Sequence, residues 1–379
     1  MKKLIRITTV PLSLDKLLQG QLRFMSSYYD ITAISSEKEY LKKIGKREGV
    51  ATFPLEMTRK ITPIKDIVSL FKLVIYLKKN KPFIVHSHTP KAGIIGMLAA
   101  KIAGVPHRLH TVAGLPLLET EGAKRKMLNI VEKLTYSCAT AVYPNSKGLY
   151  HIILENKFCK SQKLKVLANG SSNGIDTAYF NSDILSELEK NTLRTSLAIT
   201  QDHFVYVFVG RLVSDKGINE LVASFSKLPT EKCKLLLVGP LEPELDPLLP
   251  ETLRKISDSP NIVSVGYQND VRPYLSIAHC LVFPSYREGF PNVVMQAGAL
   301  GLPCIVSDIN GCNEIVEHQK NGVIIPVKNE EKLLAAMQEV FSKPDFIAKM
   351  KDNSRSMIVE RYEQKIVWEA MLKEYQKLK

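Results

Sequence analysis

The chain has 379 residues, 45% of them hydrophobic and 24% charged, which is typical of a globular protein with room for two domains and excludes a disordered or fibrous chain. Its formal net charge of +14 is uneven, because residues 1–180 contain 29 Lys and Arg against 12 Asp and Glu, whereas the remainder contains 23 against 26. The basic half predicts an anionic partner; the alternative is that its charge only keeps the surface soluble. Nucleic acid is disfavoured as the partner, because the basic residues show neither interleaved aromatic residues nor a recognised motif.

The cysteines and the apolar segments limit where the protein works. The six cysteines are scattered, with no C-x-x-C pair and no His at metal-ligand spacing, so we expect neither disulfides nor a zinc site. Arg6 interrupts the apolar start of the chain, which argues against a signal peptide. Lys72 and Lys101 interrupt the best candidates for a spanning helix. These features predict a cytoplasmic protein that does not cross a membrane.

In the first half, short β-rich apolar runs alternate with longer amphipathic segments. This rhythm predicts strands and helices that build a parallel sheet covered on both faces. The predicted strands are 4–10, 30–35, 83–88, 107–112, 141–146 and 164–168, and the predicted helices include 15–28, 91–104 and 123–138. The polar, Gly-rich segment NGSSNGID at 169–176 then predicts a domain boundary.

The same rhythm restarts after this boundary. Apolar runs at 203–210, 233–239, 261–267, 280–285, 303–308 and 322–327 predict a second sheet, and the tail from Asp345 reads as helices. The fold class is therefore α/β with two Rossmann-like, doubly wound parallel sheets. We expect domains at 1–176 and 177–360, with a C-terminal helix at 361–379 that packs back on the first domain. Such sheets bind ligands at the carboxyl ends of their strands.

Two cations follow the strand predicted at 203–210. Arg211 stands directly after this run, and Lys216 follows five residues later, beside Gly217. Arginine can bind two phosphate oxygens at once and lysine adds a mobile point charge, so the pair is suited to a diphosphate. On this segment alone, a solvated surface pair is the alternative.

The segment 287–303, REGFPNVVMQAGALGLP, follows another predicted strand. Its Glu288 is followed by Gly289, which permits close approach of a ligand, and by Pro291 and Asn292, which predict the start of a helix. The N–H groups and dipole of that helix would attract an anion. Cations opposite a carboxylate at a helix start suggest a nucleotide sugar, whose hydroxyls donate to the carboxylate. Alternatively, Glu288 only stabilises the helix start.

Together these motifs identify the chain as a suspected member of a known family. GRLVSDKG and PSYREGFPNVVMQAGALGLPCIVSD resemble the donor-binding signature of the retaining glycosyltransferases of family 4, which have the two-domain GT-B fold. In the first half, VHSHTPKAGIIGMLAAKIAGVPHRLHTVAGLP, PNSKGL and NGSSNGID resemble members that assemble bacterial surface polysaccharides such as capsule and O-antigen. The resemblance covers nearly the whole chain. It implies an N-terminal acceptor-binding domain and a C-terminal nucleotide-sugar-binding domain that face a central cleft.

The family has a Glu, seven residues and a second Glu, whereas this chain has Glu288 and then Gln296. The resemblance implies that Glu288 lies near the donor sugar and that residue 296 binds the nucleotide ribose. Gln296 keeps a carbonyl oxygen but lacks charge, which we expect to weaken donor binding by about 1 kcal/mol. Alternatively, Gln296 marks an altered or decayed donor site.

The resemblance also assigns the remaining site residues. The implied catalytic residues are His110, Arg211, Lys216 and Glu288. The implied donor-binding residues are Gly210, Gly266, Tyr267, Gly289, Phe290, Pro291, Asn292, Val293 and Gln296, with the base near 265–267. His88 and Lys91 are acceptor-side candidates, and so is Gly20, although the glycine-rich loop of the family is poorly developed here.

No metal and no cofactor are expected. The chain has no Asp-x-Asp motif to hold a divalent cation, in line with a family that retains the anomeric configuration without a metal. Arg211, Lys216 and the helix start would then stabilise the charge that develops on the leaving group. No enzymic nucleophile is required.

The expected reaction moves a sugar, with N-acetylhexosamine favoured by the resemblance, from a UDP-linked donor to a lipid-linked or other glycan acceptor. The expected acceptor is a polyprenyl-diphosphate-linked sugar at the inner face of the cytoplasmic membrane. The basic and apolar segments 119–134 and 64–81 could dock on that anionic surface. For 64–81 the simpler interpretation is a helix that covers the sheet. The alternatives are a nucleotide-sugar epimerase and a non-catalytic partner subunit that binds sugar nucleotides.

Overall fold

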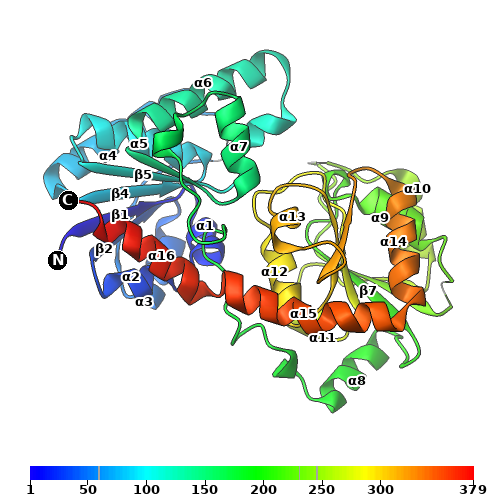
Figure 1. Ribbon diagram of the computed structural model, residues 1–379. Helices are drawn as coiled ribbons and strands as arrows, with labels where there is room; N and C mark the ends of the chain where they lie inside the picture. Colours follow the sequence, from blue (N-terminus) through cyan, green and yellow to red (C-terminus); the bar gives the residue numbers. More distant parts are fainter. Residues whose placement is uncertain (59, 230, 245) are drawn as a thin grey trace. The chain divides into compact units, whose positions relative to one another are not determined.

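The computed structural model describes residues 1–58, 60–229, 231–244 and 246–379. The chain forms two compact units, shown in Figure 1: unit 1 comprises Met1–Asn173 and Lys365–Lys379, and unit 2 comprises Gly174–Gln364. The main change of unit thus falls three residues before the boundary predicted after 176, and the return to unit 1 falls four residues after the boundary predicted after 360. Unit 1 is therefore built from both ends of the sequence.

Unit 1 is built on a sheet of six parallel strands in the order β3-β2-β1-β4-β5-β6. Its strands are β1 (Lys3–Ile7), β2 (Asp30–Ser35), β3 (Ala51–Pro54), β4 (Ile84–His88), β5 (His107–Val112) and β6 (Ala141–Pro144). All five residues of β4 are buried, as expected for a central strand with helices on both faces. The order reverses between β1 and β4, which defines a topological switch point.

Eight helices belong mainly to unit 1 among the described residues. They are α1 (Pro11–Leu17), α2 (Gln21–Ser26), α3 (Lys38–Glu48), α4 (Pro63–Asn80), α5 (Pro90–Ile102), α6 (Gly122–Cys138), α7 (Lys147–Glu155) and α16 (Gln364–Gln376), with short 3₁₀ turns η1 (Pro116–Glu119) and η2 (Ser161–Lys163). The single helical segment predicted at 15–28 is wrong in detail. The chain there forms α1, which ends at Leu17, and α2, which begins after Gly20, a residue in the left-handed conformation (φ 78°).

Helix α16 packs on unit 1 through apolar residues and through one buried polar contact. Met371, Leu372 and Tyr375 belong to a core cluster that includes residues of α1, α2, β1 and β2. The Tyr375 hydroxyl lies 2.6 Å from Nη1 of the fully buried Arg6 in β1 and 2.5 Å from Nδ1 of His86 in β4. The last helix therefore completes the interior around the first strand.

Unit 2 repeats the architecture with a sheet in the order β12-β11-β10-β7-β8-β9, again with parallel pairs throughout. Its strands are β7 (Phe204–Val209), β8 (Cys233–Val238), β9 (Ile262–Ser264), β10 (Cys280–Phe283), β11 (Cys304–Ser307) and β12 (Gly322–Ile325). The order reverses between β7 and β10. The prediction of two doubly wound parallel sheets is confirmed.

The helices of unit 2 cover both faces of this sheet. They are α8 (Glu187–Ser196), α9 (Ile218–Phe225), α10 (Pro250–Asp258), α11 (Arg272–Ser276), α12 (Asn292–Ala299), α13 (Cys312–Ile315), α14 (Glu330–Ser342) and α15 (Pro344–Tyr362), with 3₁₀ turns η3 (Ser182–Ile184) and η4 (Ser214–Lys216). Helix α8 begins with a capping box of Ser186 and Glu189. In the described parts of both units, no helix combines the length and the apolar character needed to span a membrane.

Candidate active site

The switch point of unit 2 brings together two loops that are far apart in sequence. The loop after β7 contains Gly210, Arg211 and Lys216, and the loop after β10 contains Glu288. Because β7 and β10 are neighbours in the sheet, their carboxyl ends lie side by side. A doubly wound sheet opens a crevice at this position, where its ligands bind.

Lys216 and Glu288 meet in this crevice. The ammonium Nζ of Lys216 lies 2.5 Å from Oε1 of Glu288, and both side chains are largely buried. The hydroxyl of Ser285, which is fully buried, lies 3.1 Å from the same carboxylate oxygen and 3.4 Å from the ammonium. Among the described residues no donor reaches the second oxygen, Oε2, of Glu288. This oxygen is therefore available to accept a hydrogen bond from a ligand.

A glycine allows the two loops to pack so closely. Gly217 follows Lys216 at φ 71°, and a Cβ atom there would lie 2.3 Å from the carbonyl oxygen of Pro284. A side chain at this position would clash with the backbone after β10 and would also strain the left-handed turn. Gly217 thus fixes the distance between the Lys216 turn and the Glu288 loop.

Arg211 supplies a second cation at the end of β7. Its Nη1 lies 2.9 Å from Oε2 of Glu242, and 42% of the Arg211 side chain remains exposed. Arg287 pairs with Asp215 in the same region. The guanidinium of Arg211 has further N–H groups besides the one that Glu242 accepts, so it can bind an anion without giving up this ion pair.

Helix α12 begins at the predicted residue, Asn292, and its amino end follows the Glu288 loop after β10. Among the described residues no side chain caps this helix, which leaves its first N–H groups without a side-chain acceptor. The preceding loop is anchored, because the ring of buried Phe290 packs edge-on against Tyr362 at 5.4 Å and the Asn310 amide donates to the carbonyl groups of Glu288 and Gly289. A rigid helix start of this kind is suited to an anion.

Gln296 lies in the second turn of α12 and is partly buried. Within the described part of the chain its side-chain amide has no hydrogen-bond partner, so its carbonyl oxygen and its N–H groups are available to a ligand. Asn292 and Val293, in the first turn, are also partly exposed, whereas Pro291 is buried. Asn292, Val293 and Gln296 lie on this short helix and Pro291 is its N-cap, next to the Glu288 loop.

The third part of the site follows β9. Gly266 accepts a hydrogen bond of 2.8 Å from the N–H of Gly239 after β8, and Gly210 donates to Val238 at 2.9 Å, so the backbones at the ends of these three strands are linked. Tyr267 is 64% exposed. Its loop lies three strands from the Glu288 loop, in the order β10-β7-β8-β9, a distance of about 14 Å at the usual strand spacing. The carboxylate, the cations and the exposed ring thus form a line that suits an extended ligand.

His110 lies in unit 1 and faces helix α5. It is buried in β5, its Nδ1 lies 2.8 Å from the Ser87 hydroxyl, and its ring lies so close to Gly93 that a Cβ there would be 2.6 Å away. Burial lowers the pKa of His110 to about 4. The imidazole is therefore neutral at pH 7, and it can accept or donate a hydrogen bond through Nε2, which has no partner among the described residues.

His88, at the end of β4, points to the other face of the sheet. In the register of β4 and β5, Ser87 pairs with His110 and His88 pairs with Thr111, so the two histidines point in opposite directions. The His88 ring stacks on His86 at 4.4 Å, and its buried Nε2 has no hydrogen-bond partner. Burial holds the pKa of His88 well below its ordinary value. The structure does not bring His88 and His110 together.

The other two acceptor-side candidates are already engaged in contacts. Lys91, in the first turn of α5, lies 2.8 and 2.9 Å from the carboxylate oxygens of Asp66 in α4. Gly20 lies under Trp368 of α16, where a Cβ would be 2.8 Å from the indole ring. Lys91 therefore connects α5 to α4, and Gly20 leaves room for the Trp368 ring of α16.

The structure adds residues that the sequence did not single out. Ser285 holds the Glu288 carboxylate, and Asn310 holds the backbone of the same loop from the turn after β11. Gly311 lets this turn approach, since a Cβ there would lie 2.6 Å from the carbonyl oxygen of Gly289. Ser285 is the last residue of one predicted strand, and Asn310 and Gly311 follow another by two and three residues, so a search of every strand end and the loop after it would have found them.

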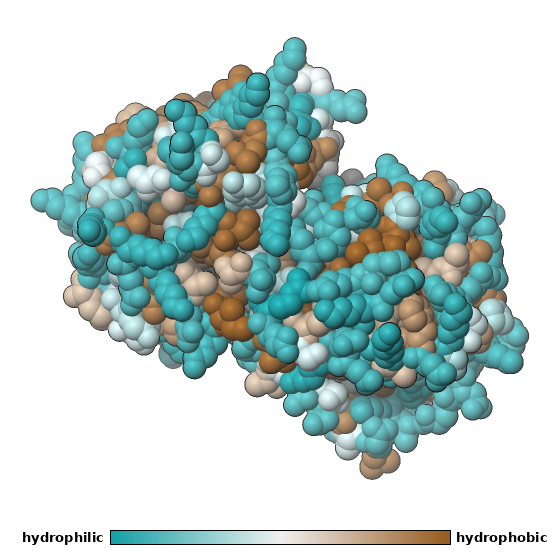
Figure 2. All heavy atoms as spheres, in the orientation of Figure 1, coloured by the Kyte–Doolittle hydropathy of each residue, from teal (hydrophilic) through white to brown (hydrophobic). Residues whose placement is uncertain are grey.

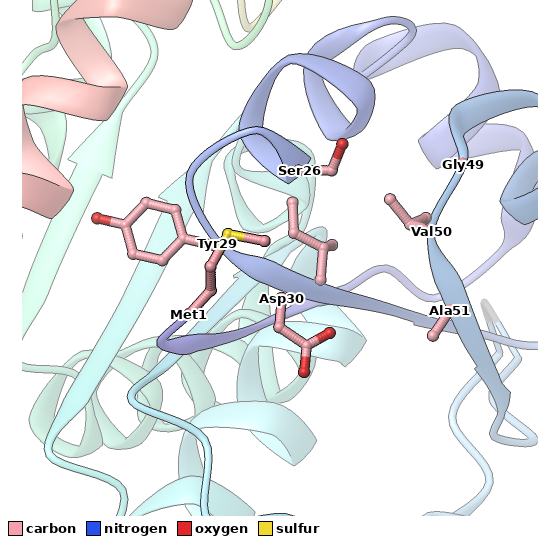
Figure 3. A pocket seen from close by; sticks show the side chains of 8 residues that line it. Met1, Ser26, Tyr29, Asp30, Gly49, Val50 and Ala51 are labelled. Carbon is pink, nitrogen blue, oxygen red and sulfur yellow. The ribbon is translucent and has the colours of Figure 1, made fainter.

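Two further features of the described residues bear on ligands. No group of three or more His, Cys, Asp or Glu side chains there could hold a metal ion. A pocket of about 390 Å³, shown in Figure 3, is lined by Met1, Tyr29, Asp30 and the start of β3. It lies at the amino-terminal edge of the unit 1 sheet, opposite the edge where open α/β sheets bind ligands, and we assign it no function.

Comparison with known proteins gives consistent results for the whole chain. Residues 189–357 match the family model "Glycosyl transferases group 1", and residues 18–146 match "Glycosyl transferase 4-like". The chain is 32% identical to the capsular polysaccharide biosynthesis glycosyltransferase CapM of Staphylococcus aureus, over 98% of this chain and 96% of CapM. It is 29% identical to an Escherichia coli UDP-Gal:alpha-D-GlcNAc-diphosphoundecaprenol alpha-1,3-galactosyltransferase, over 87% and 84% of the two chains. Among solved structures, Anabaena HepE in complex with UDP matches at a TM-score of 0.81 with 17% identity, over 100% of both chains.

Proposed function

The chain belongs to the group 1 glycosyltransferases and has their GT-B fold, and on this premise we propose its donor, acceptor and mechanism. The proposed reaction transfers a sugar from a UDP-linked donor, with retention at the anomeric carbon and without a metal, to a lipid-linked glycan acceptor. The product is a precursor of a bacterial surface polysaccharide. N-acetylhexosamine is the preferred candidate for the sugar.

One observation supports this proposal above the others, namely the order of groups along the carboxyl edge of unit 2. The Glu288 carboxylate, the cations Lys216 and Arg211, and the exposed Tyr267 follow β10, β7 and β9 in the order of the sheet. A sugar, a diphosphate and a base follow one another in the same order in a nucleotide sugar. Unit 2 is accordingly the proposed donor-binding domain, and unit 1 the proposed acceptor-binding domain.

The leaving group is the UDP diphosphate, and its developing charge has to be stabilised in the transition state. Arg211 and Lys216 supply two cations, and the uncapped start of α12 supplies backbone N–H groups and the positive end of a helix dipole. Lys216 contacts Glu288 in this structure, so it lies between the proposed sugar and diphosphate sites. Its remaining N–H groups are free to reach a phosphate oxygen.

Glu288 is proposed to orient the sugar. Lys216 and Ser285 hold Oε1, while Oε2 can accept a hydrogen bond from a sugar hydroxyl. On the acceptor side, the neutral His110 can hydrogen-bond the donor sugar or the acceptor through Nε2, with Nδ1 held by Ser87. His88, Lys91 and Gly20 remain weaker acceptor-side proposals, because contacts inside unit 1 already involve them.

The proposed acceptor is a polyprenyl-diphosphate-linked sugar. The relative from E. coli is named for such an acceptor and for a UDP-linked donor, and the CapM relative is named for capsule biosynthesis. An acceptor of this kind is anchored in a bilayer. We therefore place the protein at the inner face of the cytoplasmic membrane, as a peripheral protein that the basic surface of unit 1 attracts.

Binding of nucleotides by calorimetry, without added metal, tests the donor side. We expect UDP to bind the native protein, and Lys216→Ala and Arg211→Ala to bind it about tenfold more weakly, since each removes a charge-assisted hydrogen bond. Lys255→Ala is the matched control, because Lys255 is a surface lysine of α10 that pairs with Glu251. If UDP does not bind, or if the control loses as much affinity, the proposed donor site is wrong.

Transfer of label from UDP-sugars to a short polyprenyl-diphosphate sugar tests the chemistry. Glu288→Gln keeps the size of the side chain and removes its charge, so we expect UDP affinity to change little and transfer to fall by about 100-fold. Unchanged transfer in this variant would remove Glu288 from the mechanism. Epimerised nucleotide sugar in the absence of acceptor would identify an epimerase, and nucleotide binding without turnover on any acceptor would identify a partner subunit.

A further inference from the structure

Helix α4 has an apolar stripe on the face that it turns to solvent. Ile64, Ile67, Phe71 and Ile75 follow one another at helical spacing and are 81%, 54%, 64% and 68% exposed. The inward face of the same helix is supplied by other residues, which are Leu73, Val74 and Leu77. Covering the sheet therefore does not explain the outer stripe.

Helix α6 has a second stripe of the same kind. Met127, Ile130 and Leu134 lie at helical spacing and are all exposed. Helices α4 and α6 both pack against α5, one on each side, so the three helices form one layer over the unit 1 sheet, as Figure 1 shows. In Figure 2, apolar side chains reach the surface among charged ones in this part of unit 1. The two stripes thus belong to one helical layer.

The exposed charges of these two helices are basic. Helix α4 contains four lysines (Lys65, Lys72, Lys78, Lys79), and its single acid, Asp66, pairs with Lys91. Helix α6 contains Lys124, Arg125, Lys126 and Lys133, and its single acid, Glu132, is buried. A second copy of this chain would present the same positive charge, which disfavours pairing through this layer. A nucleic acid would leave the apolar stripes in water.

We infer that the outer faces of α4 and α6 dock unit 1 onto an anionic phospholipid bilayer. The apolar stripes enter the boundary between headgroups and acyl chains, and the lysines reach the lipid phosphates, as in amphipathic helices that lie in the plane of a membrane. This inference deepens the proposed function, since it identifies the surface that brings the enzyme to a lipid-linked acceptor. The test of membrane docking needs neither donor nor acceptor, so the docking inference and the proposed function can fail separately.

Sedimentation with lipid vesicles provides the first test. We expect the native protein to bind vesicles of phosphatidylcholine and phosphatidylglycerol, to bind pure phosphatidylcholine far more weakly, and to lose binding as salt rises. The double variant Phe71→Ser/Ile75→Ser should bind at least tenfold more weakly, because it removes two apolar side chains. Leu188→Ser on α8 of unit 2 is the control, since Leu188 is 77% exposed and lies outside the layer.

Quenching by brominated lipids locates the contact. The chain has one tryptophan, Trp368, which is packed in unit 1, so Phe71→Trp and Leu188→Trp each add a single reporter. We expect bromine on the acyl chains to quench the reporter at position 71 and not the one at 188. Equal binding by the double variant, or no quenching at position 71, would overturn the inference. So would a native dimer that Phe71→Ser/Ile75→Ser converts to a monomer, because the layer would then be an interface between copies.

Discussion

The change Tyr375→Phe removes one hydroxyl from the contact between the last helix and the first strand. Arg6 is fully buried, and it can only donate hydrogen bonds, so the Tyr375 oxygen accepts from its Nη1 at 2.6 Å. The Tyr375 proton is then directed to Nδ1 of His86 at 2.5 Å, and Nε2 of His86 donates to Thr111 at 2.8 Å. Burial holds the pKa of His86 well below its ordinary value, so this ring is neutral.

Two hydrogen bonds are lost in Tyr375→Phe, and one of them involves a charge. A bond to a charged group contributes about 1.5–3 kcal/mol and a neutral one about 0.5–1.5 kcal/mol, so we expect the free energy of unfolding of unit 1 to fall by about 2–4 kcal/mol. The guanidinium has little to replace the loss, because its Nε already lacks a partner. For a unit of this size the change corresponds to roughly 5–15 °C in Tm.

Differential scanning calorimetry measures this effect, and Tyr29→Phe is the matched control. Tyr29 packs against the Tyr375 ring in the same core, but its hydroxyl has no hydrogen-bond partner among the described residues. We expect the free energy of unfolding of Tyr29→Phe to stay within about 0.5 kcal/mol of that of the native protein. If Tyr375→Phe and Tyr29→Phe have the same Tm, the buried contact between Arg6 and Tyr375 does not stabilise unit 1 and the reasoning is refuted.

Four further changes have defined outcomes. Gln296→Glu should tighten UDP binding severalfold in calorimetry, since a charged acceptor adds about 1 kcal/mol, and unchanged affinity would remove residue 296 from the donor site. Gly217→Ala should destabilise unit 2 by roughly 2–5 kcal/mol in urea unfolding, because its Cβ meets the Pro284 carbonyl at positive φ. Burial lowers the pKa of His110 in the folded protein to about 4, so its contribution of about 3 kcal/mol to the free energy of unfolding is present above pH 6.5 and is lost as the pH falls towards 4. His110→Gln should therefore flatten the plot of the free energy of unfolding against pH between pH 6.5 and 4. Burial raises the pKa of Glu132 to about 6, so its ionisation opposes folding as the pH rises through 6; Glu132→Gln should stabilise the protein by about 2 kcal/mol at pH 8 and not at pH 4.

Most strands and the loops after them could be predicted because both depend on local pattern, but β3 (Ala51–Pro54) was missed and the strand predicted at 164–168 is wrong, since only Leu164 there makes an isolated bridge. Apolar runs of four to eight residues mark buried parallel strands, and cations or carboxylates directly after such runs lie at the ligand-binding edge. Arg211, Lys216 and Glu288 were found in this way, and so was the start of α12 at Asn292. The helix boundary at Gly20 was missed, because an amphipathic pattern can continue across a left-handed turn.

The contacts between these loops could not be predicted from local pattern. Lys216 meets Glu288 because β7 and β10 are neighbours, and the strand order that makes them neighbours is a property of the whole sheet. Ser285 and Asn310 became significant only when the Glu288 loop was seen between them. The exposure of Phe71 is a similar case, since an amphipathic segment does not reveal which of its apolar residues face the sheet.

The return of the C-terminal helix to unit 1 has a consequence for how the protein is made on the ribosome. Arg6 and Tyr375 are 369 positions apart, so at about 5–20 residues per second the first strand waits roughly 20–70 s for its buried partner. Unit 2 is one uninterrupted segment, Gly174–Gln364, and has all its residues before α16 is complete. During synthesis the unit that starts first is therefore finished last, and until then its core around the buried Arg6 guanidinium lacks the helix that covers it.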